Sequence, residues 1–138
     1  MWIKILMKIN VFLYRLSGGW LGSKMAGQSV LLLHTTGRKS GNSYVTPLNY
    51  YRDDGRYVLV ASNWGKDHNP DWFYNLTAQG KATIQVKDRN LPVRASLAEG
   101  DEYRRLWRSV TDENDFYLRY QEQTDRKIPL VILTPEKA

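Results

Sequence analysis

Two polar turns in the middle of the chain separate apolar runs that can pair as antiparallel strands. Asp53-Asp54-Gly55 joins the alternating segment 43–52 to residues 56–62, and Asp88-Arg89-Asn90 joins KATIQVK to LPVRASLA. Short turns rich in Asp, Asn and Gly between such runs are the sequence signal of a β-hairpin. The pattern therefore constrains the chain to an antiparallel sheet that contains at least two hairpins.

The remaining apolar segments add strands and helices around these hairpins. SVLLLHTT, residues 29–36, and IPLVIL, residues 128–133, read as buried strands. Asn69-Pro70 is a helix-start signal, with Asn as the N-cap and Pro at the first helical position. Helices are predicted over 71–79, 101–110 and 114–123. Short antiparallel strands with helices inserted between them favour an α+β or mainly β fold, a small β-barrel with flanking helices.

Residues 1–20 are predicted to form a separate unit ahead of a barrel domain spanning 21–138. Apolar residues between positions 2 and 16 recur at helical spacing on one face, and a second face carries Lys4, Lys8 and Arg15. This helix has two interpretations: it covers one flank of the core, or it lies on a membrane surface with its basic stripe facing lipid headgroups. Residues 21–28 are small and polar and are predicted to be a linker or loop.

The composition limits the chemistry that the chain can perform. It contains no cysteine and only two histidines, so disulfides and thiolate chemistry are excluded and no metal site is predicted. A reducing cytoplasmic location fits this composition. The formal charge of +6 favours an acidic partner, which could be a phosphorylated cofactor, a nucleic acid or an anionic membrane. Because no RNA-binding signature is present and the basic residues are not gathered in one arm, no nucleic-acid partner is expected.

The stretch TTGRKSG, residues 35–41, is the sharpest candidate for a ligand site. Gly37 and Gly41 let the backbone bend and expose its N–H groups. Arg38 and Lys39 supply two cations, and Ser40 adds a hydroxyl. Since Arg can bind a phosphate bidentately, a phosphate-binding turn is one interpretation, and a solvated basic hairpin loop is the other.

A second candidate lies between a predicted strand end and a helix start, in residues 61–75. Trp64 and Trp72 could flank a planar ring, while Ser62 and Asn75 could hydrogen-bond its edges. The alternative is that Trp72 belongs to the core and that the segment only caps the helix.

Tyr117 and Tyr120 form a third candidate because they lie on one face of a predicted helix. A phenol can donate a proton or a hydrogen bond and can stack against a substrate. Amphipathic packing of the two rings explains the same spacing.

Together these motifs resemble a known family. GRKSG, VTPL, the NP-W-NL segment and TDR-IP occur over about residues 16–134 in the order typical of deazaflavin-dependent nitroreductases and quinone reductases. Members are small split-β-barrel proteins of FMN-binding-like fold that bind coenzyme F420, an 8-hydroxy-5-deazaflavin. The resemblance implies a single-domain split β-barrel with flanking helices. It also implies an oxidoreductase that transfers a hydride from reduced F420 to an electron-poor planar acceptor: a quinone, a nitroaromatic or an activated enone.

The resemblance further implies a role for each matching residue. The cofactor's phosphate and acidic tail would be contacted by Arg38, Lys39 and Ser40. The ring system would lie beside the strand Tyr44, Val45, Thr46, Pro47, Leu48 and Asn49. The ring edge would be lined by Val60, Ala61, Ser62 and Asn63. The site would be closed by Asp71, Trp72, Phe73, Tyr74 and Asn75. The catalytic hydrogen bond or proton would come from Ser62, Tyr117 or Tyr120, the two tyrosines standing at the substrate mouth.

Two positions depart from the family pattern, and both are on the substrate side. Asn63-Trp64 stands where a lysine or glycine followed by glycine is common, and Asn114 stands where some members carry tyrosine. Three questions stay open from the sequence. The same fold could hold FMN or haem, or could bind a cofactor without catalysis. The chain could be a monomer or a homodimer. It could also contact the inner membrane face peripherally through residues 1–16.

Overall fold

The computed structural model describes residues 24–25 and 28–136 of the chain. The helix predicted over 2–16 and the separate unit predicted over 1–20 lie outside the described residues. Within the part that is described, no helix is long and apolar enough to cross a membrane.

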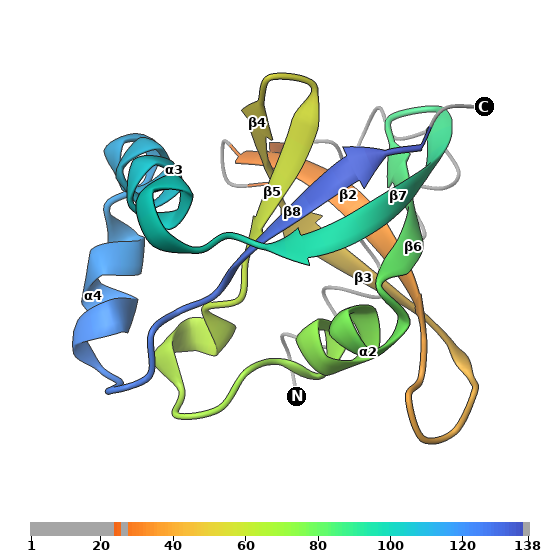
Figure 1. The fold of residues 1–138 in the computed structure, drawn as a ribbon, viewed down its shortest axis with the longest axis horizontal. Coiled ribbons are helices and arrows are strands. Elements are labelled where there is room, and N and C mark those ends of the chain that lie inside the picture. The colour runs from red at the N-terminus through yellow and green to blue at the C-terminus, as the bar shows by residue number, and fades with distance from the viewer. Residues whose placement is uncertain (1–23, 26–27, 137–138) are drawn as a thin grey trace.

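The described residues form a strongly curled antiparallel sheet with helices on two sides (Figure 1). Its strands are β1 (Lys24–Met25), β2 (Gln28–Thr36), β3 (Ser43–Asn49), β4 (Tyr51–Asp53), β5 (Arg56–Val60), β6 (Lys81–Val86), β7 (Arg89–Leu97) and β8 (Leu130–Pro135). The helices are the 3-10 turn η1 (Asn63–Gly65), α2 (Asp71–Gln79), α3 (Gly100–Glu113) and α4 (Phe116–Glu122).

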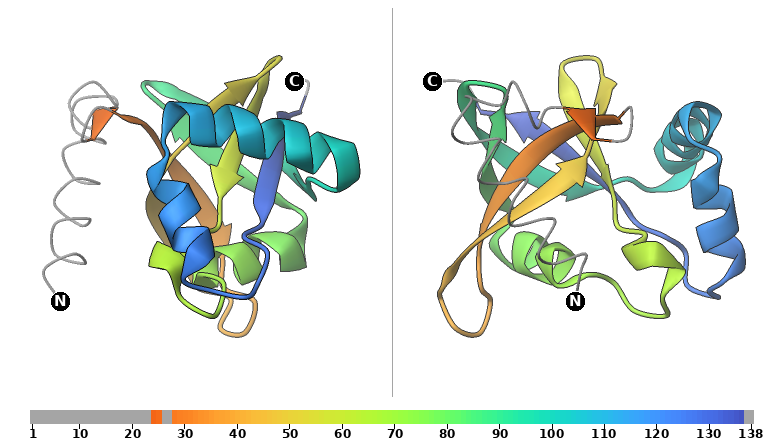
Figure 2. Two further views of the ribbon diagram at one scale, coloured as in Figure 1. Left: turned by 90° about the vertical axis from the view of Figure 1, so that its left-hand side faces the viewer. Right: turned by 180° about the vertical axis from the view of Figure 1, so that it is seen from behind.

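The strands form a single antiparallel sheet. The strands run β1-β2-β6-β7-β8-β5-β4, and β3 pairs with β2 on the edge opposite β6. Each pairing is antiparallel. This arrangement confirms the predicted barrel-like α+β fold with flanking helices. The β2–β3 turn projects beyond the sheet, and α2 lies next to it (Figures 1 and 2).

The central strands are buried on both faces, which explains why their sequences are apolar without alternation. On β5 and β8, Leu59 and Val131 belong to a core cluster with Trp72 and Leu76 of α2. Their neighbours Val58, Leu130 and Ile132 belong to a second cluster with Tyr103, Leu106 and Val110 of α3. Successive residues of a strand point to opposite faces. The two clusters therefore sandwich the same pair of strands between α2 on one side and α3 on the other.

Several predicted boundaries are corrected by the structure. The segment predicted as one strand over 43–52 is divided between β3 and β4 at Tyr50. The second hairpin turns at Lys87-Asp88, ahead of the predicted 88–90. Residues 21–28, predicted as a linker, contain the short strand β1. The predicted final strand and the predicted 114–123 helix are shifted or shortened to β8 and α4.

The predicted N-cap of α2 is wrong. Pro70, with an extended backbone, occupies the cap position, and no side-chain hydrogen bond caps the helix. The Asn69 side chain is engaged elsewhere, because its Oδ1 accepts a hydrogen bond from Arg126 at 2.7 Å.

A charge cluster fastens the β4–β5 hairpin to α3. Arg105 donates two hydrogen bonds to the Asp53 carboxylate, at 2.9 and 3.2 Å, and Arg56 pairs with the same carboxylate. Arg56 also reaches Glu102 at 3.3 Å. These hydrogen bonds, from Arg105 first and then from Arg56, lower the pKa of Asp53 from 3.8 to about 2. The Asp53 side chain is only 15% exposed, so the cluster is better shielded than an ordinary surface pair.

We expect Asp53→Asn to lower the free energy of unfolding at pH 7 by about 1–2 kcal/mol, the scale of a hydrogen bond to a charged group. Because the folded-state pKa is depressed, this contribution is present above the ordinary pKa of 3.8 and is lost as the pH falls towards about 2. Urea unfolding of both proteins between pH 7 and 3 should show the gap narrowing below pH 4–5. Asp101→Asn, in an exposed pair with Arg104, is the control and should change stability by less than about 0.5 kcal/mol.

Candidate functional site

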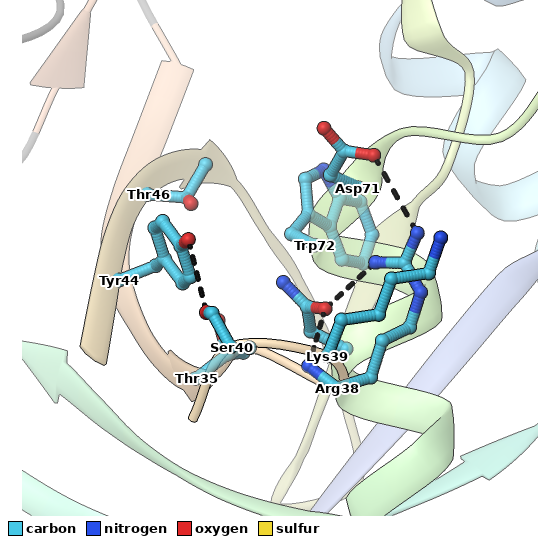
Figure 3. A pocket seen from close by; sticks show the side chains of 10 residues that line it. Thr35, Arg38, Lys39, Ser40, Tyr44, Thr46, Asp71 and Trp72 are labelled. Atoms are coloured by element: carbon cyan, nitrogen blue, oxygen red, sulfur yellow. Dashed lines mark hydrogen bonds and ion pairs between the residues drawn. The ribbon is translucent and has the colours of Figure 1, made fainter. Parts of the chain in front are cut away.

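A pocket of about 330 Å³ lies between the β2–β3 turn and the start of α2 (Figure 3). The turn contributes three consecutive polar side chains, and β3 and α2 form the opposite walls. The lining residues are Thr35, Gly37, Arg38, Lys39, Ser40, Tyr44, Thr46, Asp71, Trp72 and Asn75. The structure therefore brings the first and second predicted site segments together, although they are far apart in the sequence.

Backbone hydrogen bonds and two glycines shape the turn. The Gly37 N–H donates to the Asn42 carbonyl at 2.7 Å, and the Gly41 N–H donates to the Gly37 carbonyl at 3.0 Å. A Cβ on Gly37 would lie 2.6 Å from Ser40 Oγ and 2.8 Å from the Tyr44 ring, so a larger residue there would displace both side chains. Gly41 has a φ of +74°, which side-chain-bearing residues adopt at a cost.

Asn75 attaches the turn to α2 and directs Arg38. Its Oδ1 accepts hydrogen bonds from the Arg38 backbone N–H at 3.1 Å and from the Arg38 guanidinium at 2.8 Å. The guanidinium also lies 3.9 Å from Asp71 and 5.1 Å from the centre of the Tyr74 ring. Since Asn75 is 6% exposed, this bond anchors the base of the pocket.

The pocket carries a net positive charge. Asp71, 92% exposed, is the only carboxylate lining it, and its contact with Arg38 is long. No carboxylate in residues 24–25 and 28–136 pairs with Lys39. Figure 3 shows the Arg38 and Lys39 side chains extending along the same wall towards Asp71 and Trp72. Two cations against one solvated carboxylate favour an anionic ligand.

Thr35 offers a second sign of a ligand. Its side chain is 7% exposed, lines the pocket, and has no hydrogen-bond partner for its Oγ1 among the described residues. Buried hydroxyls are normally paired. The Thr35 hydroxyl is thus placed to hydrogen-bond a molecule held in the pocket. A phosphorylated polar ligand would supply the missing hydrogen-bond partner.

Strand β3 leads from this pocket to the tyrosines. Tyr44 and Thr46 line the pocket on one face of the strand, while Asn49 at its far end lies near enough to Tyr117 to lower the pKa of that phenol. At about 3.3 Å per residue the strand spans roughly 20 Å. The backbone of β3 therefore connects the pocket wall with the neighbourhood of α4.

The loop between β5 and α2 is held by Arg126. The Arg126 guanidinium donates to the carbonyls of Ala61, Ser62 and Lys66 at 3.1, 2.7 and 2.8 Å, and to Asn69 Oδ1 at 2.7 Å. Desolvation by these neighbours lowers the pKa of Arg126 from its ordinary value. One side chain from the TDRKIP segment thus fixes the whole loop from both ends.

Trp64 is presented to solvent by an unusual backbone. Asn63, Trp64 and Gly65 have φ values of 47°, 60° and 78°, and a run of left-handed residues costs free energy wherever a side chain is present. Gly65 packs so closely on α4 that a Cβ would lie 3.1 Å from the Tyr120 backbone. The Trp64 side chain is 57% exposed and meets the Tyr120 ring edge-on at 6.3 Å.

Tyr117 and Tyr120 face different surroundings. Tyr117 is 4% exposed and packs in the second core cluster, and burial raises the pKa of its phenol well above the ordinary value. Its hydroxyl accepts a hydrogen bond from the Tyr51 hydroxyl at 3.2 Å. Tyr120 is half-buried and stands between Tyr117 and Trp64.

Comparisons with known proteins identify the family. The family model described as F420H(2)-dependent quinone reductase matches residues 6–135. The chain belongs to this family. It is 37% identical to an F420H(2)-dependent quinone reductase of Mycobacterium tuberculosis, over 94% of this chain and 89% of the relative. The family resemblance identified from the motifs is thereby confirmed.

Two solved structures support the family fold. One, described as an F420-H2 dependent reductase (FDR-A), is 35% identical, covers 75% of this chain and 92% of its own, and has a TM-score of 0.69. The other, described as a domain-swapped dimer, is 31% identical, covers 96% of both chains and has a TM-score of 0.72.

Not all predicted site residues of this family member meet at the pocket. Five of the predicted side chains lie in or against the core or on the opposite face of β3: Val45, Leu48, Val60, Ala61 and Phe73. Pro47 is buried and pairs with Leu32, and Tyr74 stacks outside on Arg38. Ser62 and Asn63 belong to the loop that Arg126 holds. No comparison tests these residue roles, and they stay predictions.

Three residues that the structure brings into the site were missed by sequence reasoning. Thr35 carried a signal, since it opens the TTGRKSG motif. Arg126 carried one too, because it lies in the quoted TDR-IP motif, although its target loop is some 60 positions away in the chain. Tyr51 had none, because its hydrogen bond to Tyr117 joins segments that nothing in the sequence connects.

We expect Arg126→Lys to loosen the loop. An ammonium has no planar fork with which to serve four acceptors at once, so some carbonyls would be left unpaired at a cost of about 1–3 kcal/mol. Hydrogen exchange should then accelerate across residues 61–69, with a smaller change in α3. Arg119→Lys, at an exposed position on α4, is the matched control. Equal exchange in both variants would contradict the assigned clamp.

Proposed function

We propose that this chain is a quinone reductase that takes its electrons from reduced coenzyme F420. The observation that carries the proposal is the positively charged pocket at the β2–β3 turn, in a chain that belongs to the F420H(2)-dependent quinone reductase family. When bound, the reduced cofactor supplies a hydride, which with one proton from a donor or from solvent converts the quinone to the hydroquinone. The protein itself supplies binding, orientation and electrostatics.

The residues of the pocket fit such a cofactor. Arg38 and Lys39 would hold the phosphate and the acidic tail, with Arg38 already directed by Asn75. The unpaired Thr35 hydroxyl would hydrogen-bond the polar linker between phosphate and ring. Trp72, which is in the core on one side and lines the pocket on the other, would form an apolar wall. No further cofactor such as FMN is needed to account for these features.

The acceptor would lie at the other end of β3, near the loop and α4. Trp64 and Tyr120 offer aromatic surface for a planar quinone, and stacking favours electron-poor rings held parallel to the donor. The Ser62, Tyr117 and Tyr120 hydroxyls are the proposed donors to the oxygen on which negative charge develops. We retain nitroaromatics and activated enones as further acceptors, because they share the planar electron-poor character.

Assembly and location are part of the same proposal. A relative of 31% identity is described as a domain-swapped dimer, which supports a homodimer for this chain. A cytoplasmic location, with peripheral contact at the inner membrane face through residues 1–16, would bring a lipophilic quinone within reach.

The direct test is a fluorescence titration of the protein with F420, followed by oxidation of the reduced cofactor in the presence of quinones, nitroaromatics and enones. We expect binding of F420, no comparable binding of FMN, and turnover with quinones. Tight FMN binding with no response to F420 would overturn the assignment, and F420 binding without turnover on any acceptor would favour a cofactor-binding module instead.

The anion-binding role of the turn has its own test. Lys39→Ala should weaken F420 binding by roughly tenfold, the loss of one charge-assisted contact, and Asn75→Ala should do likewise because Arg38 loses its anchor. Arg108→Ala, exposed on α3 and remote from the pocket, removes the same charge and is the control. An equal loss of affinity in the control would show that only the net charge matters.

A further inference from the structure

A row of hydrogen bonds, part-buried at Asn114 and buried at Tyr51 and Tyr117, crosses from the end of α3 to α4 through β4. Asn114, at the C-cap of α3, donates from Nδ2 to the Tyr51 hydroxyl at 2.5 Å. The Tyr51 hydroxyl donates to the Tyr117 hydroxyl at 3.2 Å. Tyr51 and Tyr117 are 7% and 4% exposed. The row therefore runs through the protein interior and ends on a tyrosine proposed above as a donor.

The row has a direction. Asn114 Nδ2 can only donate, so the Tyr51 oxygen accepts the hydrogen bond from Asn114. The single Tyr51 proton is then donated to Tyr117. Tyr117 thus receives a hydrogen bond from Tyr51. A hydroxyl that accepts a hydrogen bond from its neighbour keeps its own proton for another acceptor.

The rings leave this hydroxyl little freedom. Tyr51 and Tyr117 meet edge-to-face at 6.2 Å, and Phe116 packs on Tyr117 at 4.4 Å. Burial raises the pKa of both phenols, so each remains protonated at neutral pH. Tyr117 is accordingly a neutral donor of fixed orientation at the end of β3.

A buried tyrosine with a purely structural bond looks different. The Tyr103 hydroxyl, also 7% exposed, donates to the Ile128 carbonyl at 2.5 Å. The Tyr103 hydroxyl therefore donates its proton to a hydrogen bond within the fold, whereas the Tyr117 hydroxyl does not donate to Tyr51.

We propose that Tyr51 and Asn114 are positioning residues, which orient the Tyr117 hydroxyl so that it donates to the acceptor oxygen during hydride transfer. This inference rests on the proposed function. A hydride from the reduced cofactor would bring two electrons and one hydrogen to a ring atom or oxygen of the quinone. Negative charge would then appear on a quinone oxygen, and solvent would supply the final proton. A donor whose orientation is set beforehand stabilises that charge without reorganisation.

The test is a double-mutant cycle on the turnover number. Tyr51→Phe keeps the ring and removes the hydroxyl, so Tyr117 loses its incoming hydrogen bond. We expect the turnover number with a quinone to fall about tenfold, less than the roughly hundredfold or more that loss of a direct donor costs, while F420 affinity stays unchanged. In a Tyr117→Phe background the same substitution should have no further effect, because Tyr51 acts only through Tyr117.

Tyr103→Phe is the matched control, since it also removes a buried hydroxyl next to α3 and should leave turnover unchanged. Should Tyr51→Phe fold poorly, Asn114→Ala removes only the first donor of the row and is expected to lower turnover with the same dependence on Tyr117. Turnover that survives Tyr51→Phe, or falls equally in both backgrounds, would overturn the inference. An inactive wild-type protein would instead count against the proposed function.

Discussion

The structure depends on the burial of β5 and β8 on both faces. Val58 and Ile132 pack under α3, and Leu59 and Val131 pack over α2, so one pair of strands supports two layers of helices. The site segments leave from the ends of these strands. The Ala61 N–H donates to the Pro129 carbonyl at 3.0 Å immediately beyond the paired residues. Backbone pairing alone therefore places the loop that carries Ser62 beside the segment that carries Arg126.

This arrangement separates the two halves of the site. The β2–β3 turn is tied to α2, on one side of the central strands, through Asn75. Tyr117 is tied to β4 and α3, on the other side, through Tyr51. Strand β3 is the element that reaches both. In the proposed function, an anion at the turn and an acceptor at α4 would therefore be placed by different layers of the fold, and substitutions in one layer need not disturb the other.

The sequence predicted well what depends on local pattern. The Asp53–Gly55 hairpin turn, the helix over 71–79 and the basic turn all follow from turn chemistry or apolar periodicity, and the family motifs identified the fold class. It failed where a long-range contact overrides a local rule. Asn69 has the residue type of an N-cap, but its oxygen serves Arg126. Leu48 and Phe73 lie within the family's site motifs, but Leu48 of β3 packs against the core and Phe73 lies on the buried face of α2.

Asn114 shows why a single departure from a motif is hard to interpret alone. From the sequence, replacing a tyrosine by Asn114 removes a hydroxyl from the substrate side. In the structure, the Asn114 amide donates to the Tyr51 hydroxyl at 2.5 Å. The polar group at position 114 therefore lies behind Tyr117, against Tyr51, while the bulky Trp64 side chain lies beside Tyr120. In the proposed function, the two departures together would give an acceptor site that is more apolar at its mouth and no less polar at its base.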